Sequence, residues 1–143
     1  EVVGINSAKV AVSGVEGIGF AIPINTAKPI LQELAERGRI ARPYLGASLM
    51  DQEIADRYGF EINLHGGIFL VKVVPGSPAA KADIRPGDII LSFNSNKVKT
   101  ALDLRTALSK CKVGDRAEVT IMRNGQRESR TVVLEEVPKD YGN

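Results

Sequence analysis

GGIFLVKVVPGSPAAKADIRPGDIILSFNS, residues 66–95, decides the fold, because turn signals and apolar runs alternate along it. The β-branched and aromatic run 68–74 lies between a Gly-Gly pair and a Pro-Gly pair, which predicts a strand. Ser77 then precedes Pro78 and several good helix formers, the order of an N-cap, a first-turn proline and a short helix. A Pro-Gly turn and a second apolar run, 89–93, complete a strand–helix–turn–strand unit.

The composition is globular, with 43% hydrophobic residues, 25% charged residues and a formal net charge of +2. The basic residues are spread along the chain, so nucleic acid is not an expected partner. Cys111 is the only cysteine, which excludes an internal disulfide and a cysteine-rich metal site, and we expect a buried structural thiol. No apolar run approaches the ~20 residues needed to cross a bilayer. Nothing in the sequence calls for a cofactor.

The first 38 residues follow a different pattern. Two short apolar stretches, 1–8 and 17–25, are joined by a loop with glycine and serine, which predicts a hairpin that is marginal alone. Residues 26–37 predict an amphipathic helix with Asn25 as N-cap and Gly38 as terminator. Its apolar stripe has little to pack on. We therefore expect this part to dimerise, to exchange with another chain or to pack on the rest of the molecule.

Two sets of motifs carry a resemblance to a known family. GIGFAIPIN at 17–25, with LQELAERGRIARPYLG at 31–46, is similar to the end of the trypsin-like protease domain of HtrA/Deg serine proteases. PGSPA at 75–79 and RPGDIIL at 85–91 are similar to the centre of the PDZ domain that follows it in that family. The resemblance covers nearly the whole chain. Asp83 departs from it, since glycine is usual there, but aspartate tolerates left-handed backbone better than most residues.

The resemblance implies an α+β, mostly β chain in three parts. Residues 1–38 are a hairpin and helix left from the protease domain, 39–138 are a PDZ domain (a small antiparallel β-sandwich or partial barrel with two helices), and 139–143 are a tail or linker. It also implies that the catalytic triad lies upstream of Glu1, so that this chain is a fragment with no catalytic residues. By the same analogy, the parent's primary specificity pocket and one specificity loop correspond to Asn6, Ser7 and Ala8 and to residues 9–16.

Pro43-Tyr44-Leu45-Gly46-Ala47 is the segment where a binding site is most strongly indicated. A glycine between apolar residues, just ahead of a strand, lets successive backbone N–H groups point into one concavity, and such a nest binds a carboxylate. The segment looks like the carboxylate-binding loop of HtrA-type PDZ domains. By that resemblance, the amides of Leu45, Gly46 and Ala47 hold a peptide's terminal carboxylate. The peptide's backbone then pairs with the strand Ala47-Ser48-Leu49-Met50. Arg42 either adds positive charge or is solvated.

A predicted helix over 101–110 forms the other wall of the site. Thr100 is a good N-cap, and Asp103 completes a capping-box-like pair. Helical spacing puts Ala101, Arg105 and Leu108 along one stripe. PDZ domains often carry histidine where Ala101 stands, which selects a hydroxyl, so an apolar third-last ligand residue is favoured here. Four apolar residues would surround the ligand's last side chain, although each taken singly is also consistent with core: Leu45, Ala47, Leu49 and Leu108.

The leading prediction is a peptide-binding PDZ module of an HtrA/Deg-type serine endopeptidase, recognising hydrophobic C-termini of unfolded or substrate proteins in protein quality control. The resemblance implies a periplasmic or cell-envelope, homo-oligomeric parent, with membrane anchoring left open. Two alternatives remain. The PDZ domain docks on its own protease domain or a neighbouring subunit, or the chain hydrolyses peptides itself, which the missing triad disfavours.

Overall fold

A computed structural model of the chain describes residues 1–9 and 19–138. The chain divides into two compact units, Glu1–Ile40 and Ala41–Asn143, whereas the sequence predicts a boundary after residue 38. Nearly all of the predicted specificity loop, 9–16, and the whole predicted tail, 139–143, lie outside the described residues. No helix in the described ranges is both long enough and apolar enough to cross a membrane.

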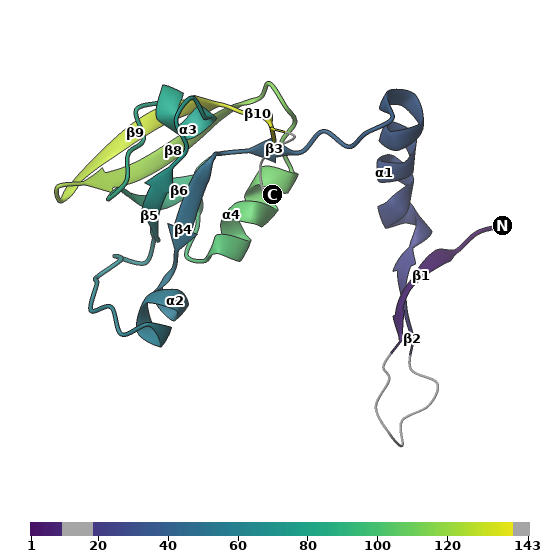
Figure 1. Ribbon diagram of the computed structural model, residues 1–143, viewed down its shortest axis with the longest axis horizontal. Helices are drawn as coiled ribbons and strands as arrows, with labels where there is room; N and C mark the ends of the chain where they lie inside the picture. Colours follow the sequence, from purple (N-terminus) through teal and green to yellow (C-terminus); the bar gives the residue numbers. More distant parts are fainter. Residues whose placement is uncertain (10–18, 139–143) are drawn as a thin grey trace, which may run out of the picture. The chain divides into compact units, whose positions relative to one another are not determined.

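The first unit is a hairpin followed by a helix (Figure 1). Strands β1 (Gly4–Lys9) and β2 (Gly19–Pro23) pair antiparallel, and α1 (Ile24–Arg37) follows directly. Gly38 ends the helix as predicted: it has a φ of 67°, and its N–H donates to the Leu34 carbonyl at 2.8 Å.

The start of α1 corrects the sequence prediction. The helix begins at Ile24, so Asn25 lies inside the first turn and does not cap it. Pro23 stands at the N-cap position without a side-chain hydrogen bond. The first amide of the helix, that of Ile24, donates to the carbonyl of Val3, the residue before β1, at 3.0 Å.

The apolar stripe of α1 is largely uncovered. The stripe consists of Ala27, Ile30, Leu31 and Leu34. Ala27 is buried, while the other three side chains are about half exposed. Exchange, dimerisation or packing of this stripe on other parts of the molecule therefore stays a prediction.

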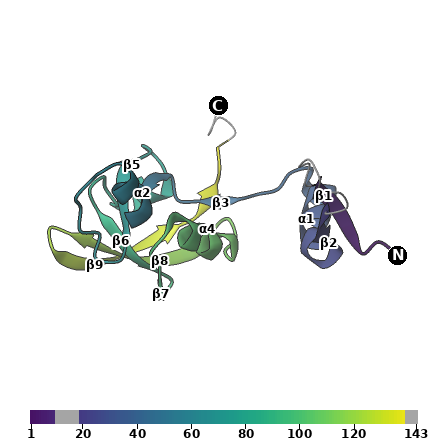
Figure 2. The same cartoon turned by 90° about the horizontal axis from the view of Figure 1, so that it is seen from below.

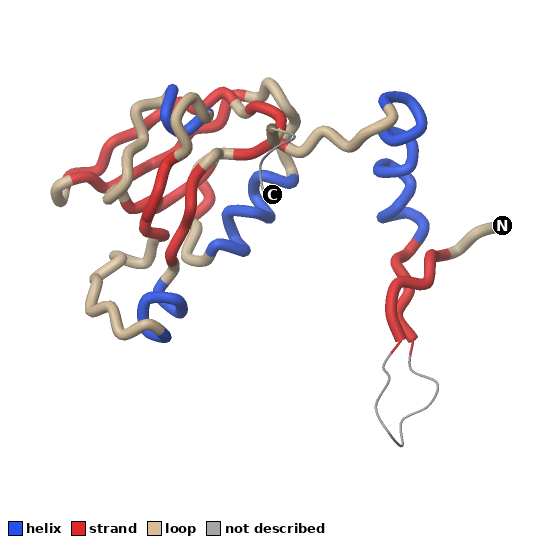
Figure 3. Tube along the Cα trace, viewed as in Figure 1, coloured by secondary structure: helices blue, strands red, loops and turns tan. Residues whose placement is uncertain are grey.

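The second unit is built on one antiparallel sheet, with strand order β4-β5-β6-β8-β9 and β7 paired to β6 (Figure 3). A separate two-stranded pair joins β3 (Pro43–Tyr44) to β10 (Glu135–Glu136). The chain is thus α+β and mostly β, as predicted. The strands of the main sheet are β4 (Ala47–Met50), β5 (Ile68–Val73), β6 (Ile89–Phe93), β7 (Asn96–Lys97), β8 (Arg116–Arg123) and β9 (Gln126–Val133).

Three helices lie in this unit: α2 (Gln52–Arg57), α3 (Pro78–Lys81) and α4 (Ala101–Ser109). The caps of α3 and α4 are the predicted ones. Ser77 Oγ accepts from the Ala80 N–H at 3.3 Å, and Thr100 with Asp103 forms a capping box. Helix α2 begins at Gln52 because Asp51 caps it: Asp51 Oδ1 accepts from the Ile54 N–H at 3.1 Å.

Two special backbone positions follow their sequence signals. Asp83 has a φ of 57°, so aspartate adopts the left-handed conformation that glycine would take there. Asn124 and Gly125 have φ values of 51° and 77°, which fits the tight hairpin turn between β8 and β9.

One hydrophobic core holds the second unit together. Its buried members come from the sheet, from α3 and from α4, and Leu104 attaches α4 to the rest. Cys111 is partly buried against this core, and burial raises the pKa of its thiol, consistent with the expected structural role. The largest fully buried side chains include Leu64, Ile68, Leu70, Ile84, Ile90, Phe93, Leu104 and Ile121.

Candidate peptide-binding site

Leu45 and Gly46 lie between β3 and β4, and together with Ala47, the first residue of β4, they are called the amide loop below. Two successive carbonyls of this loop bind the same segment. The Leu45 carbonyl accepts from the Ala79 N–H at 3.0 Å. The Gly46 carbonyl accepts from the Val74 N–H at 2.8 Å and from Ser77 Oγ at 3.3 Å. Residues 74–79, called the bracing segment, therefore hold both carbonyls on one side.

The orientation of these carbonyls fixes the orientation of two amides. In a trans peptide the C=O of one residue and the N–H of the next point in opposite directions. The N–H groups of Gly46 and Ala47 are consequently directed away from the bracing segment. Among the described residues, none accepts a hydrogen bond from the Gly46 N–H. Two of the three amides predicted for the nest, those of Gly46 and Ala47, therefore point the same way, which is the arrangement that an anion-binding nest requires.

Gly46 makes this arrangement possible in two ways. Its φ of 81° lets successive peptide planes face the same way, whereas in a strand they would alternate. A Cβ at this position would lie 2.2 Å from Ser77 Cβ and 2.7 Å from Ser77 Oγ. Any side chain would therefore push the amide loop off the bracing segment.

Strand β4 offers an open edge next to the amide loop. It pairs with β5 and, within the described ranges, with no other strand. Along β4 the side chains of Ala47 and Leu49 are partly buried against the core, while Ser48 is exposed. An unpaired strand edge presents free N–H and C=O groups, so an extended peptide can add to it.

In Figure 1, helix α4 lies on the side of β4 that faces away from β5. At its start, the Ala101 N–H donates to Asp51 Oδ2 at 3.1 Å, and Asp51 directly follows β4. Elsewhere the helix contacts β3, next to which it lies in Figure 2. The open edge of β4 and the start of α4 are therefore brought together at Asp51.

The predicted site residues take different positions. Leu45 is only 4% exposed and belongs to the core, so its side chain lies beneath the amide loop. Leu108 is partly buried against the same core, and Tyr44 and Ala101 are also partly buried. The exposed members are Arg42, Ser48 and Arg105.

The residues assigned to the parent's specificity pocket lie in the first unit, on β1. Asn6 and Ser7 are exposed, and Ser7 Oγ donates to the Phe20 carbonyl at 3.3 Å across the hairpin. The Ala8 side chain is not among the described parts. The pairing register shifts between Asn6 and Ala8, so the strand is irregular at this point.

Two residues of the site were missed from the sequence as site residues. Ser77 was identified as a helix cap, but its hydrogen bond to Gly46 spans 31 positions. Asp51 was not singled out, although Asp before Gln-Glu-Ile is an N-cap signal that could have drawn attention to it. Its hydrogen bond to Ala101 spans 50 positions and leaves no local signal.

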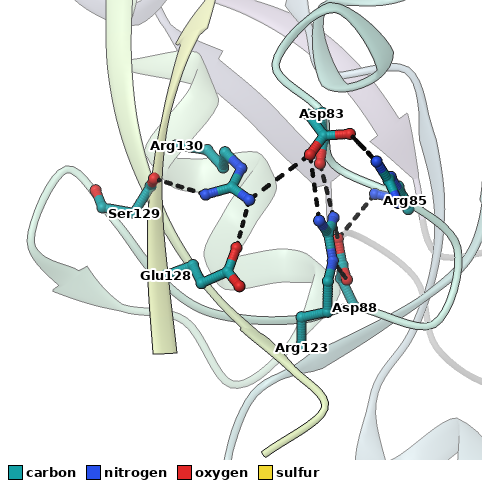
Figure 4. Close-up of polar contacts among 7 residues, drawn as sticks. All are labelled: Asp83, Arg85, Asp88, Arg123, Glu128, Ser129 and Arg130. Carbon is teal, nitrogen blue, oxygen red and sulfur yellow. Dashed lines mark hydrogen bonds and ion pairs between the residues drawn. The ribbon is translucent and has the colours of Figure 1, made fainter. Parts of the chain in front are cut away.

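A second polar group, called the ion cluster, includes residues 83–88, which follow the bracing segment in the chain (Figure 4). It comprises Asp83, Arg85, Asp88, Arg123, Glu128 and Arg130. Asp88 is 2% exposed; its Oδ1 accepts from Arg123 Nε at 2.8 Å, and its Oδ2 accepts from Arg123 Nη2 at 2.7 Å and the Arg85 N–H at 2.8 Å. Hydrogen bonds from Arg85 and Arg123 lower the pKa of Asp83.

Comparison with known proteins fits this geometry. Residues 43–134 match the family model of the PDZ domain. The chain belongs to the PDZ domain family. Over nearly its whole length it is also homologous to the HtrA/DegP serine proteases, as the resemblance predicted.

Three relatives illustrate the match. The chain is 40% identical over 144 residues to the serine protease Do-like HtrA of Bacillus subtilis, covering 95% of this chain and 32% of that protein. It is 35% identical over 136 residues to the periplasmic pH-dependent serine endoprotease DegQ of Escherichia coli, covering 94% and 30%. A solved structure of a variant of the HtrA-type protease AlgW with a decapeptide has a TM-score of 0.81 and 28% identity, covering 99% and 44%.

The chain thus spans about a third of the length of these curated relatives and under half of the solved chain. It carries the PDZ domain of an HtrA/DegP-type protein, preceded by a hairpin and a helix.

Proposed function

We propose that this chain is a peptide-binding module that captures the free C-terminus of a polypeptide with hydrophobic last residues. The observation that carries the proposal is the pair of amides of Gly46 and Ala47, directed away from the bracing segment next to the open edge of β4. Backbone N–H groups that converge without an internal acceptor suit a carboxylate, because such charge-assisted hydrogen bonds are strong.

The ligand's backbone would add to β4 as an antiparallel strand. Its carboxylate lies at the amide loop, and the residues before it run toward Met50. Strand β4 has four residues, so at ~3.3 Å per residue it can pair with roughly three or four ligand residues. The affinity would then depend mainly on the last few residues of the ligand.

The side chains around this edge favour an apolar ligand end. Ala47, Leu49 and Leu108 are partly buried against the core. An apolar ligand side chain that packs on them would remove the remaining apolar surface of both partners from water. At the start of α4, Ala101 offers no side-chain acceptor for a hydroxyl. A ligand with apolar last and third-last residues therefore fits better than one with Ser or Thr.

The proposal extends to the parent protein. The relatives are serine proteases, some of them named periplasmic. We infer an extracytoplasmic parent that uses this module in protein quality control, to deliver substrates or to relieve inhibition. The present chain would bind without cleaving, and turnover of casein by the purified chain would contradict that.

Isothermal titration tests the binding proposal directly. A peptide ending in Val or Leu is compared with the same peptide as its C-terminal amide. We expect the free acid to bind roughly tenfold more tightly or better, since hydrogen bonds to a charged group are worth about 1.5–3 kcal/mol. Equal affinity for the two peptides would overturn carboxylate recognition. If neither peptide bound, docking of this domain on the parent's own protease domain would become the better explanation.

A further inference from the structure

We propose that Asp51 is a positioning residue that holds the start of α4 against the end of β4 and thereby sets the selectivity of the site for the ligand's third-last residue. The proposal rests on the proposed peptide-binding function. It concerns the end of the site opposite the amide loop. No ligand contact by Asp51 itself is involved.

Asp51 connects three elements through one carboxylate. It directly follows β4, its Oδ1 accepts from the Ile54 N–H of α2 at 3.1 Å, and its Oδ2 accepts from the Ala101 N–H of α4 at 3.1 Å. The residue is 8% exposed. Both carboxylate oxygens are thus engaged inside the domain, and neither helix can shift without breaking a charge-assisted hydrogen bond.

The hydrogen bond to Ala101 is unusual for a helix start. The first amides of a helix have no partner within it and are normally capped by residues nearby in the chain. Around the start of α4 the other capping bonds follow that rule, since the Asp103 N–H donates to Thr100 Oγ1 at 3.1 Å and Asp103 Oδ2 accepts from the N–H groups of Lys99 and Thr100 at 3.0 Å each. Only the Ala101 amide is satisfied by a residue 50 positions away.

The carboxylates of Asp51 and Asp103, both at the start of α4, therefore have different roles. Asp103 stabilises the helix start locally, whereas Asp51 fixes the helix start to the edge strand. The amide loop is held by the bracing segment and has no bond to Asp51. Loosening Asp51 should therefore change the fit of a side chain beside Ala101, while recognition of the carboxylate stays intact.

The test compares Asp51→Asn with the matched control Asp103→Asn. Both remove one negative charge next to α4. Asp51→Asn leaves one carbonyl oxygen for two amides that two oxygens now serve, whereas in Asp103→Asn one oxygen can still accept from both amides. Each protein is titrated with peptides that end in Val and carry Ala, Leu or Trp at the third-last position, as free acids and as amides. For each protein we compare the affinities of the peptides with the best and the worst third-last residue. We expect the ratio of these two affinities to shrink about fivefold in Asp51→Asn, which corresponds to ~1 kcal/mol. The ratio of the affinities for free-acid and amidated peptide should stay as in the wild type. In Asp103→Asn both affinity ratios should equal those of the wild type.

Hydrogen exchange of the free chain gives a readout that needs no ligand. Asp51→Asn should accelerate exchange of the Ala101 amide, and Asp103→Asn should leave exchange at Ala101 unchanged. Unchanged exchange at Ala101, or unchanged selectivity with accelerated exchange, would overturn the positioning role. A loss of the acid-to-amide preference in Asp51→Asn would also overturn it, since the whole domain would then have changed. Failure of the proposed function is distinct, because the wild type itself would then bind acid and amide equally.

Discussion

The second unit contains two polar groups that differ in how completely they are paired. In the ion cluster, both carboxylate oxygens of Asp88 accept hydrogen bonds from within the domain. In the amide loop, the carbonyls of Leu45 and Gly46 are paired, but the Gly46 and Ala47 amides are directed away from their supports. The paired carboxylate of Asp88 thus has a structural role, whereas the half-paired amide loop is where we propose that a ligand binds.

The two groups are also linked along the chain. Residues 74–79 brace the amide loop, and residues 83–88 of the same connection between β5 and β6 enter the ion cluster. Arg123 of β8 bonds both Asp83 and Asp88, and Asp88 raises the pKa of Arg123 further above its usual range. The ion cluster thus fixes the end of the connection between β5 and β6, and the beginning of the same connection orients the amide loop.

Among the variants, a substitution of Asp88 in the ion cluster should have the largest effect on the free energy of unfolding. Asp88→Ala leaves Arg123 partly buried with its main partner gone, and removing one member of a buried pair costs about 3–5 kcal/mol. We expect a loss of that size in the free energy of unfolding, measured by urea denaturation. Arg123→Met should cost at least as much as Asp88→Ala, since it leaves the 2% exposed carboxylate of Asp88 with only the Arg85 N–H as a donor among the described residues. A loss below about 1 kcal/mol for Asp88→Ala would contradict a structural role.

Gly46→Ala tests the half-paired group. The new Cβ would lie 2.2 Å from Ser77 Cβ, so the loop must shift, at a cost of about 1–3 kcal/mol. We expect the preference for free-acid over amidated peptide to disappear in titrations.

The matched control is Gly125→Ala. Gly125 has a φ of 77°, close to the 81° of Gly46, but a Cβ there would meet nothing within 4 Å. This variant carries the conformational strain alone and should keep the free-acid preference. If both variants lost the preference, the close approach to Ser77 would not be the cause.

Ser77→Ala should have a smaller effect on the same loop. Ser77 is 1% exposed, and its hydroxyl both caps α3 and donates to the Gly46 carbonyl. Losing the cap costs about 1 kcal/mol of stability. Since the Val74 amide still binds the Gly46 carbonyl, we expect free-acid affinity to fall only about threefold to fivefold, less than for Gly46→Ala. Unchanged affinity in titrations would show that the backbone donors suffice.

The comparison also explains what the sequence could predict. Signals between chain neighbours were sufficient for the bounds of β4 and β6 and for the cap at Ser77. The glycine pattern likewise indicated the nest. The bonds that position the site join residues far apart in the chain, such as Asp51 with Ala101. Periodicity and turn chemistry describe only local neighbours, so such pairs leave no trace in one sequence.

The smallest expected effect is on the pH dependence of stability, at the exposed edge of the ion cluster. Hydrogen bonds from Arg85, and then from Arg123, lower the pKa of Asp83 in the folded state. A lowered folded pKa stabilises the domain above the unfolded value of about 3.9, and this contribution is lost as the pH falls through the folded value. Asp83→Asn should therefore have a lower Tm than the wild type at pH 6, and the two should converge as the pH falls below the unfolded value. Thermal melts followed by circular dichroism between pH 7 and 2.5 would measure this. A constant difference across that range would mean that Asp83 acts through backbone conformation, at its φ of 57°, and not through its charge.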